Sequence, residues 1–158
     1  MAWKSYELDR AAQRLVLKAL ERDSKSLNQS YKMRMAVAYG LERFWGEHLR
    51  FLQPKKDGKE YTEKEQEDNN KSKYWKQTWD EFTKIMSKAG VTIPNDPIHP
   101  DKKGKLPTQD IKAMSQKLWD LSVEDQRVAI AVLTQLCDCI VWWTQRYKTG
   151  RLDNETNS

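Results

Sequence analysis

Apolar residues recur every three or four positions along most of this 158-residue chain, and clear alternation with polar residues is absent. A period near 3.6 residues is typical of amphipathic helices, whereas half-buried strands alternate with a period of two. The helical pattern covers five segments, at about 5–22, 29–52, 74–89, 108–121 and 122–148. The sequence therefore predicts an all-α fold, a compact bundle of about five helices.

The last of these segments is the least polar. At 100° per residue, Arg127, Thr134, Asp138 and Gln145 fall close to one line, and nearly every other position is apolar. A helix that is apolar on almost all sides is usually buried. We therefore expect a C-terminal helix, capped by Ser122, that is buried at the centre of the bundle.

The chain is predicted to form one helical domain over 1–150, followed by a polar tail at 151–158. Residues 55–73 are almost wholly polar and predict a mobile loop, and prolines punctuate a second connection at 91–107. No apolar run approaches the roughly 20 residues that cross a bilayer, so no membrane partner is expected. Two cysteines and the absence of a signal peptide predict a reducing, cytoplasmic compartment.

Positive charge is concentrated in the first third of the chain. Residues 1–56 hold 12 Lys and Arg against 6 Asp and Glu, whereas the whole chain has a net charge of +5. Clustered Lys and Arg indicate a polyanionic partner, such as a DNA or RNA strand.

The basic residues line up on the predicted helices. On the first helix they repeat every four residues and form one ridge, at Arg10, Arg14, Lys18 and Arg22. On the second helix they lie within about 20° of one line, at Lys32, Arg43 and Arg50. A linear track suits a phosphate backbone, so we predict nucleic-acid binding by these seven residues. The alternative is an ordinary solvated helix surface.

Nothing in the sequence predicts catalysis. His48 lies in an apolar stripe, and His99 lies between two prolines without other metal ligands at zinc spacing. Cys137 and Cys139 would point to different faces of a helix, so they are expected to be small buried residues. Without a phosphate-binding glycine loop or a nucleophile motif, we expect no enzyme activity, no cofactor and no metal.

The seven tryptophans divide into two groups. Five lie at helical core spacing, Trp45, Trp75, Trp79, Trp119 and Trp143. Trp142 projects toward the polar stripe of the last helix, and Trp3 precedes the first helix. Because tryptophan is enriched in protein interfaces, Trp3 and Trp142 are the predicted partner-binding residues.

The segment 123–147, VEDQRVAIAVLTQLCDCIVWWTQRY, resembles the closing helix of the large subunit of type I-D CRISPR–Cas systems. That region is similar to a small-subunit module, which can be made separately from an internal translation start. The resemblance implies a non-catalytic small subunit, present in several copies within a crRNA-containing complex. It further implies contacts with the backbone and large subunits, and with the target–guide duplex or the displaced DNA strand.

A second hypothesis is a protein-binding helical adaptor with no nucleic-acid role. In that case the exposed tryptophans and the 55–73 loop would contact partners, and the basic tracks would serve solubility.

Overall fold

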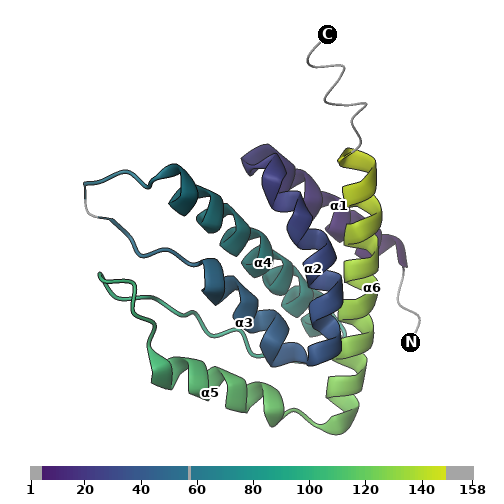
Figure 1. Ribbon diagram of the computed structural model, residues 1–158. Helices are drawn as coiled ribbons and strands as arrows, with labels where there is room; N and C mark the ends of the chain where they lie inside the picture. The colour runs from purple at the N-terminus through teal and green to yellow at the C-terminus, as the bar shows by residue number, and fades with distance from the viewer. Residues whose placement is uncertain (1–4, 57, 149–158) are drawn as a thin grey trace.

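The computed structural model describes residues 5–56 and 58–148, and these residues form an all-α bundle, as predicted (Figure 1). Six α-helices and two short 3₁₀ segments follow one another in the described part of the chain. They are α1 (Ser5–Arg22), η1 (Ser24–Asn28), α2 (Gln29–Ala36), η2 (Val37–Tyr39), α3 (Leu41–Phe51), α4 (Glu63–Lys88), α5 (Thr108–Trp119) and α6 (Val123–Tyr147).

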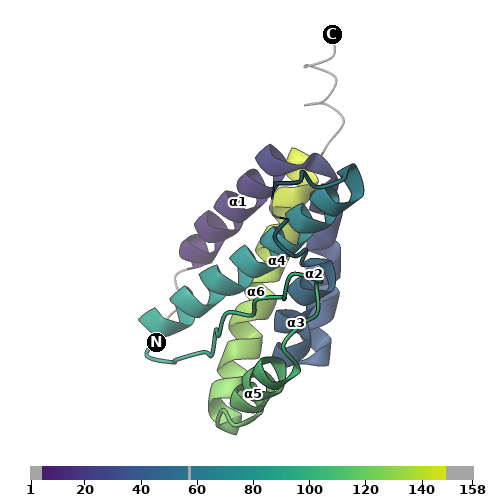
Figure 2. The same cartoon turned by 90° about the vertical axis from the view of Figure 1, so that its left-hand side faces the viewer.

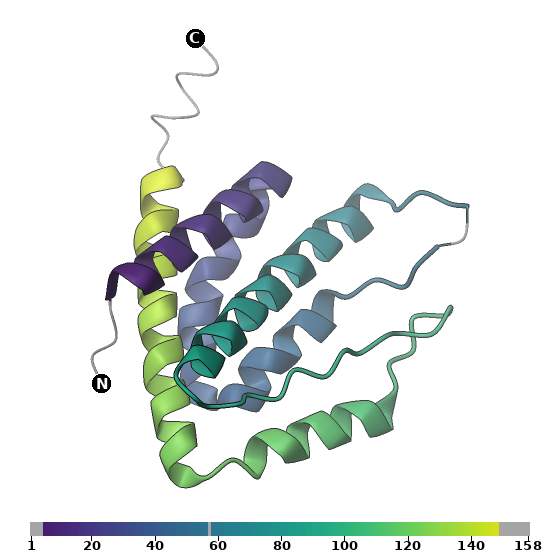
Figure 3. The same cartoon turned by 180° about the vertical axis from the view of Figure 1, so that it is seen from behind.

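Helix α6 stands at one side of the molecule, where α1 crosses it and α2 runs beside it, whereas α3, α4 and α5 extend away from it (Figures 1 and 3). Helices α1 and α2 pack directly on α6, and the contact between α1 and α6 is the most extensive between any two helices. Helices α3 and α4 run antiparallel beside each other, which the view from behind also shows (Figure 3). Helix α5 lies against α3 and leads into α6 (Figure 2).

Aromatic rings from α3 and α4 form the centre of the core. The ring of Phe44 meets Trp75 edge-on, with 5.0 Å between centroids, and lies 6.1 Å from the ring of Trp79. The indole N–H of Trp75 donates to Gln29 Oε1 at 2.9 Å, and that of Trp79 donates to Pro94 O at 3.3 Å. Large rings with satisfied N–H groups contribute much buried area at little polar cost.

The expected core position is confirmed for Trp45, Trp75 and Trp79, and Trp143 is partly buried. It is wrong for Trp119, which is 56% exposed. The buried face of α5 carries Met114 and Leu118, four residues apart. Trp119 follows Leu118 by 100° around the helix, so it points away from the core.

Three hydroxyl groups meet inside the protein and join three helices. Ser30 of α2 lies 2.5 Å from the hydroxyl oxygen of Tyr74 on α4, and Thr144 of α6 donates to Ser30 at 2.6 Å. All three residues are buried. Burial raises the pKa of Tyr74 to about 12, so its hydroxyl stays protonated and able to donate. The cluster fixes how α2, α4 and α6 lie relative to one another.

A glycine divides the helix predicted over 29–52. The chain instead forms α2, η2 and α3, with the break at Gly40. Gly40 has a φ of +111°, and a Cβ there would lie 2.8 Å from Oε1 of Glu42. The prediction of one helix is wrong because the apolar period runs through the break, with Val37 and Leu41 buried on its two sides.

Helix α4 begins at Glu63 and not, as predicted, near Tyr74, so residues 63–73 of the predicted loop 55–73 are helical. A capping box opens α4. Thr62 Oγ1 accepts from the N–H of Glu65 at 3.2 Å, and Glu65 Oε1 accepts from the N–H of Thr62 at 3.0 Å. A polar composition fits an exposed helix as well as a loop, and the Thr-x-x-Glu pattern is the signal that separates them.

The proline-punctuated connection after α4 is extended and packed, not loose. Its Ile93 and Ile98 side chains are buried. Asn95 accepts from Lys76 Nζ at 2.8 Å and donates to Asp80 Oδ1 at 2.8 Å, which ties the connection to α4. The segment therefore covers part of the α4 surface before it reaches α5.

Helix α6 is buried along one face. That face contacts the core through residues three or four positions apart, Ala129, Val132, Leu133, Leu136, Cys137, Ile140 and Thr144. Ile130 and Trp142, on other sides, are exposed. Contrary to the sequence expectation, α6 is the one helix in the described residues that is long and apolar enough to cross a membrane, a test that a core helix also passes. Because Ile130 and Trp142 are exposed, the expectation that α6 is buried on nearly all sides is correct for its core face only.

Replacing Tyr74 by Phe removes one buried hydroxyl from the cluster and leaves Ser30 with one partner fewer. We expect Tyr74→Phe to lower the free energy of unfolding by about 1–2 kcal/mol, measured by urea denaturation. Tyr31→Phe is the matched control, because Tyr31 lies at the surface of α2 and should change stability by less than about 0.5 kcal/mol. Equal effects of the two variants would contradict the role of the cluster.

The two glycines around α3 provide a second stability test. Gly40→Ala holds an L side chain at a φ of +111°, and should destabilise the protein by more than about 1 kcal/mol even after the Glu42 side chain has moved aside. Gly46 lies inside α3, and a Cβ added there would meet no atom within 4 Å, so Gly46→Ala should stabilise by up to about 1 kcal/mol. Opposite signs in thermal unfolding are the expected outcome, and a stabilising Gly40→Ala would refute the proposed strain.

Candidate nucleic-acid interface

The predicted ridge on α1 faces α4. Arg14 Nη2 lies 2.9 Å from Glu81 Oε1, and Arg22 Nη2 donates to Gln77 Oε1 at 2.7 Å. Just beyond the ridge, Lys25 Nζ pairs with Glu67 Oε1 at 2.9 Å. Burial lowers the pKa of Arg22, whose side chain is only partly exposed.

The acids of α4 therefore engage part of the ridge. Arg10 and Arg14 of α1 line a surface hollow of about 210 Å³. Two acids line the same hollow, Glu7 of α1 and Glu81 of α4. Lys18 is exposed and has no ion pair with any described residue. The four ridge residues do share one side of α1, as predicted. The sequence could not show that this side lies along the acidic residues of a helix more than 50 positions away.

The second predicted track is not a single line. Lys32 is on α2, whereas Arg43 and Arg50 are on α3, and the chain changes direction at Gly40 between them (Figure 1). The alignment assumed one continuous helix, which the positive φ at this glycine prevents. Arg43 and Arg50 remain within about 20° of each other on α3, and both are exposed.

Their local partners are weak. The Arg43 guanidinium lies 5.9 Å from the centroid of the Tyr39 ring, and Arg50 Nη2 lies 3.2 Å from Glu47 Oε1. An exposed ion pair of this kind contributes at most about 1 kcal/mol, so a phosphate can displace it. The pair Arg43 and Arg50 is therefore the part of the predicted tracks that is best placed for an anionic strand.

The structure also brings together lysines that the tracks did not include. The segment after α3 carries Lys55, Lys56 and Lys59, and the turn before α5 carries Lys102, Lys103 and Lys105. The two segments meet, because a Cβ on Gly104 would lie 3.5 Å from Pro54. Each lysine group is visible in the sequence, but their convergence depends on how α3, α4 and α5 pack.

An ion pair orders the first of these segments. Lys56 Nζ lies 2.6 Å from Glu65 Oε1, and Tyr61 donates its hydroxyl hydrogen to Pro54 O at 3.0 Å. The Lys56 ammonium, followed by the backbone N–H of Thr62, lowers the pKa of Glu65 to about 2. Lys56 and Thr62 are thus tied to the first turn of α4, and Tyr61 to Pro54.

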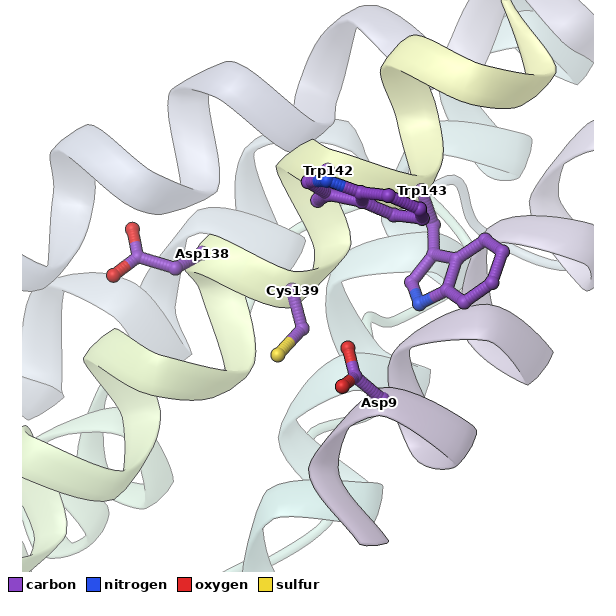
Figure 4. A pocket seen from close by; sticks show the side chains of 5 residues that line it. All are labelled: Asp9, Asp138, Cys139, Trp142 and Trp143. Atoms are coloured by element: carbon purple, nitrogen blue, oxygen red, sulfur yellow. The ribbon is translucent and has the colours of Figure 1, made fainter. Parts of the chain in front are cut away.

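A second candidate surface lies between α1 and α6. There a hollow of about 410 Å³ is lined by Asp9, Asp138, Cys139, Trp142 and Trp143 (Figure 4). Trp142, one of the two predicted partner-binding residues, is 46% exposed. Its ring packs edge-on against Trp143 at 4.7 Å, and the Arg146 guanidinium lies 4.0 Å from its centroid. Trp3, the other predicted residue, lies outside the described residues, as does the tail at 151–158.

The titratable groups of the core are held in their neutral forms. Burial lowers the pKa of His48, whose Nδ1 donates to Trp45 O at 2.5 Å. Burial, together with a hydrogen bond to Asp9, raises the pKa of Cys139 to about 12, and burial also raises the pKa of Cys137. Both thiols are therefore protonated at neutral pH. Among the described residues, no group of three His, Cys, Asp or Glu is arranged to hold a metal ion.

No protein-family model, no curated protein and no solved structure matches the chain. The resemblance to the CRISPR small subunits therefore stays a prediction, and the function has to be inferred from the chain's own chemistry.

The lowered pKa of Glu65 makes its contribution to stability depend on pH. A carboxyl with a lowered folded pKa stabilises the protein above its unfolded pKa of 4.5, and this contribution is lost as the pH falls from about 4.5 to about 2. Glu65→Gln should therefore be less stable than the wild type at pH 7, and the difference should shrink on acidification.

Urea midpoints measured across this pH range test the expectation. Glu60→Gln is the control, because it removes an acid just before α4 that belongs neither to the capping box nor to the ion pair of Lys56. A gap between the wild type and Glu65→Gln that stays constant down to pH 2 would argue against the interaction.

Proposed function

We propose that the chain is a non-catalytic small subunit of a crRNA-guided CRISPR surveillance complex, which binds the nucleic-acid backbone without sequence specificity. The observation that carries this proposal is the exposed pair Arg43 and Arg50 on one face of α3, within the third of the chain that holds the excess positive charge. Such a face can neutralise successive phosphates of a strand.

Side-chain chemistry favours backbone contacts over base reading. Arginine binds phosphate through two parallel hydrogen bonds, and lysine binds it as a point charge. These contacts fix a strand in place, while a guide RNA supplies the sequence specificity. Helix surfaces lined with such residues support a structural role in which the subunit holds the target–guide duplex or the displaced strand.

The proposed partners are those implied by the resemblance of segment 123–147 to the CRISPR small subunits. The subunit would sit in several copies against the backbone and large subunits of the complex, in the cytoplasm, and would need no cofactor. In this arrangement Lys18 and Lys32 add exposed positive charge. Arg14 and Arg22 contribute less than the sequence predicts, because they contact Glu81 and Gln77 of α4.

The alternative is a protein-binding adaptor. The exposure of Trp142 beside the α1–α6 hollow favours it, as does the 56% exposure of Trp119 at the end of α5. Exposed tryptophans are typical anchors of protein interfaces. Both functions are compatible with one molecule if the tryptophans contact other subunits and the arginines contact the strand.

A salt titration of binding to labelled single-stranded and duplex DNA tests the proposal. For the purified chain, log affinity should fall linearly with log salt. The double variant Arg43→Glu, Arg50→Glu should bind more weakly, with a slope on single strands smaller by about 1.4, because each lost phosphate contact removes about 0.7.

Lys84→Glu, Lys112→Glu is the matched control, since it makes the same charge change at exposed positions of α4 and α5. It should retain most of the affinity. Unchanged binding by the Arg43, Arg50 variant would exclude this face. If the wild type fails to bind DNA at low salt, the adaptor function is favoured instead.

A further inference from the structure

The lysine-bearing segments lie at the end of the molecule away from α6 (Figures 1 and 3). A cleft is formed between them, lined by residues of both segments. The cleft has a volume of about 470 Å³ and is referred to here as the two-loop cleft. Its lining combines apolar and basic side chains, among them Leu52, Ile98, Pro100, Lys55, His99 and Lys102. This volume is within the usual range of small-ligand sites.

The second loop has a fixed shape. Gly104 has a φ of +83°, and its N–H donates to Asp101 O at 2.9 Å. The N–H of Asp101 in turn donates to Lys105 O at 2.9 Å. This turn holds Lys103 and Lys105 at defined positions, and the buried Ile98 anchors the chain before it. Less ordering entropy is therefore lost when a ligand binds.

The one acid in the lining of the cleft is already engaged. Asp101 Oδ1 accepts the backbone N–H groups of Lys103 at 2.9 Å and Lys105 at 2.8 Å. These bonds direct the carboxylate into the turn.

Positive charge predominates around the two-loop cleft. The segments 53–62 and 99–105 together contain six lysines against Asp57, Glu60 and Asp101. Lys56 is paired with Glu65, whereas four other lysines are exposed and form no ion pair with a described residue: Lys55, Lys59, Lys103 and Lys105. Lysine charge on two separate loops can approach one anionic chain from both sides.

We propose that the two-loop cleft binds the phosphate groups of a nucleic-acid strand that crosses this end of the bundle. Ammonium groups supply the charge, and the apolar lining accommodates the sugar or base next to the bound phosphate. The inference rests on the proposed function and adds a second contact surface to it. Arg50 near the end of α3 is followed directly by the first loop, so one strand can pass from α3 onto the cleft.

The test compares two double variants of the full chain with the wild type. Lys55→Glu, Lys103→Glu removes one lysine from each loop, and Arg43→Glu, Arg50→Glu alters α3. The control is again Lys84→Glu, Lys112→Glu. Binding of a labelled oligothymidine is measured by anisotropy across a salt series, and circular dichroism confirms that each variant retains its helices.

The loop variant is expected to bind about tenfold more weakly than the wild type near 100 mM salt, with a slope smaller by about 1.4. Wild-type affinity in the loop variant would overturn the inference. The proposed function would still stand if the α3 variant binds more weakly. If the wild type does not bind the oligonucleotide, both are refuted.

A lipid headgroup carries the same phosphate chemistry and has to be separated from the strand. Vesicles of phosphatidylcholine with phosphatidylserine serve this purpose. Loss of vesicle binding in the loop variant, with unchanged oligonucleotide binding, would assign the cleft to a membrane surface and overturn the inference. Oligonucleotide binding that depends on the loop lysines, with no vesicle binding, would support it.

Discussion

The hydrogen bonds among Ser30, Tyr74 and Thr144 specify how three helices from distant parts of the chain meet. Buried hydroxyls are unfavourable unless they are paired, so any other arrangement of α2, α4 and α6 leaves polar groups unsatisfied. Tyr74 directly precedes Trp75, and the same turn of α4 therefore reaches both the hydroxyl cluster and the aromatic core. The position of α3, and with it Arg43, depends on that aromatic packing.

Much of the fold follows from the period of the apolar residues. That period gives α1 with its correct end at Arg22, and the Ser122 cap gives the start of α6. It cannot reveal the break at Gly40. The chain changes direction there in a way that keeps the apolar residues before and after the glycine buried, so the apolar period continues through the break. It also misses the first turns of α4, because the residues buried there, Asn70 and Ser72, are polar and add nothing to an apolar period. It cannot settle how much of α6 remains exposed.

The candidate site was less accessible to prediction than the fold. Helical spacing shows that Arg10, Arg14, Lys18 and Arg22 share a face, but only tertiary packing decides that this face meets Glu81. Similarly, the lysines at 55–59 and those at 102–105 lie about 50 residues apart, so no periodic pattern in the sequence shows that they meet in the fold. An excess of basic residues therefore predicts an anionic partner correctly only if the folded chain leaves those side chains exposed, instead of pairing them with its own acids.

The backbone at Gly40 has a further consequence for identifying relatives of this chain. An L side chain at this position would be held at a φ of +111°, a strained conformation, whereas no non-glycine residue in the described part of the chain has a positive φ. Any chain that preserves the angle between α2 and α3 should thus keep glycine here, together with hydroxyl-bearing residues at the positions of Ser30, Tyr74 and Thr144. These four positions form a pattern defined by geometry, which can identify distant homologues whose overall sequences have diverged.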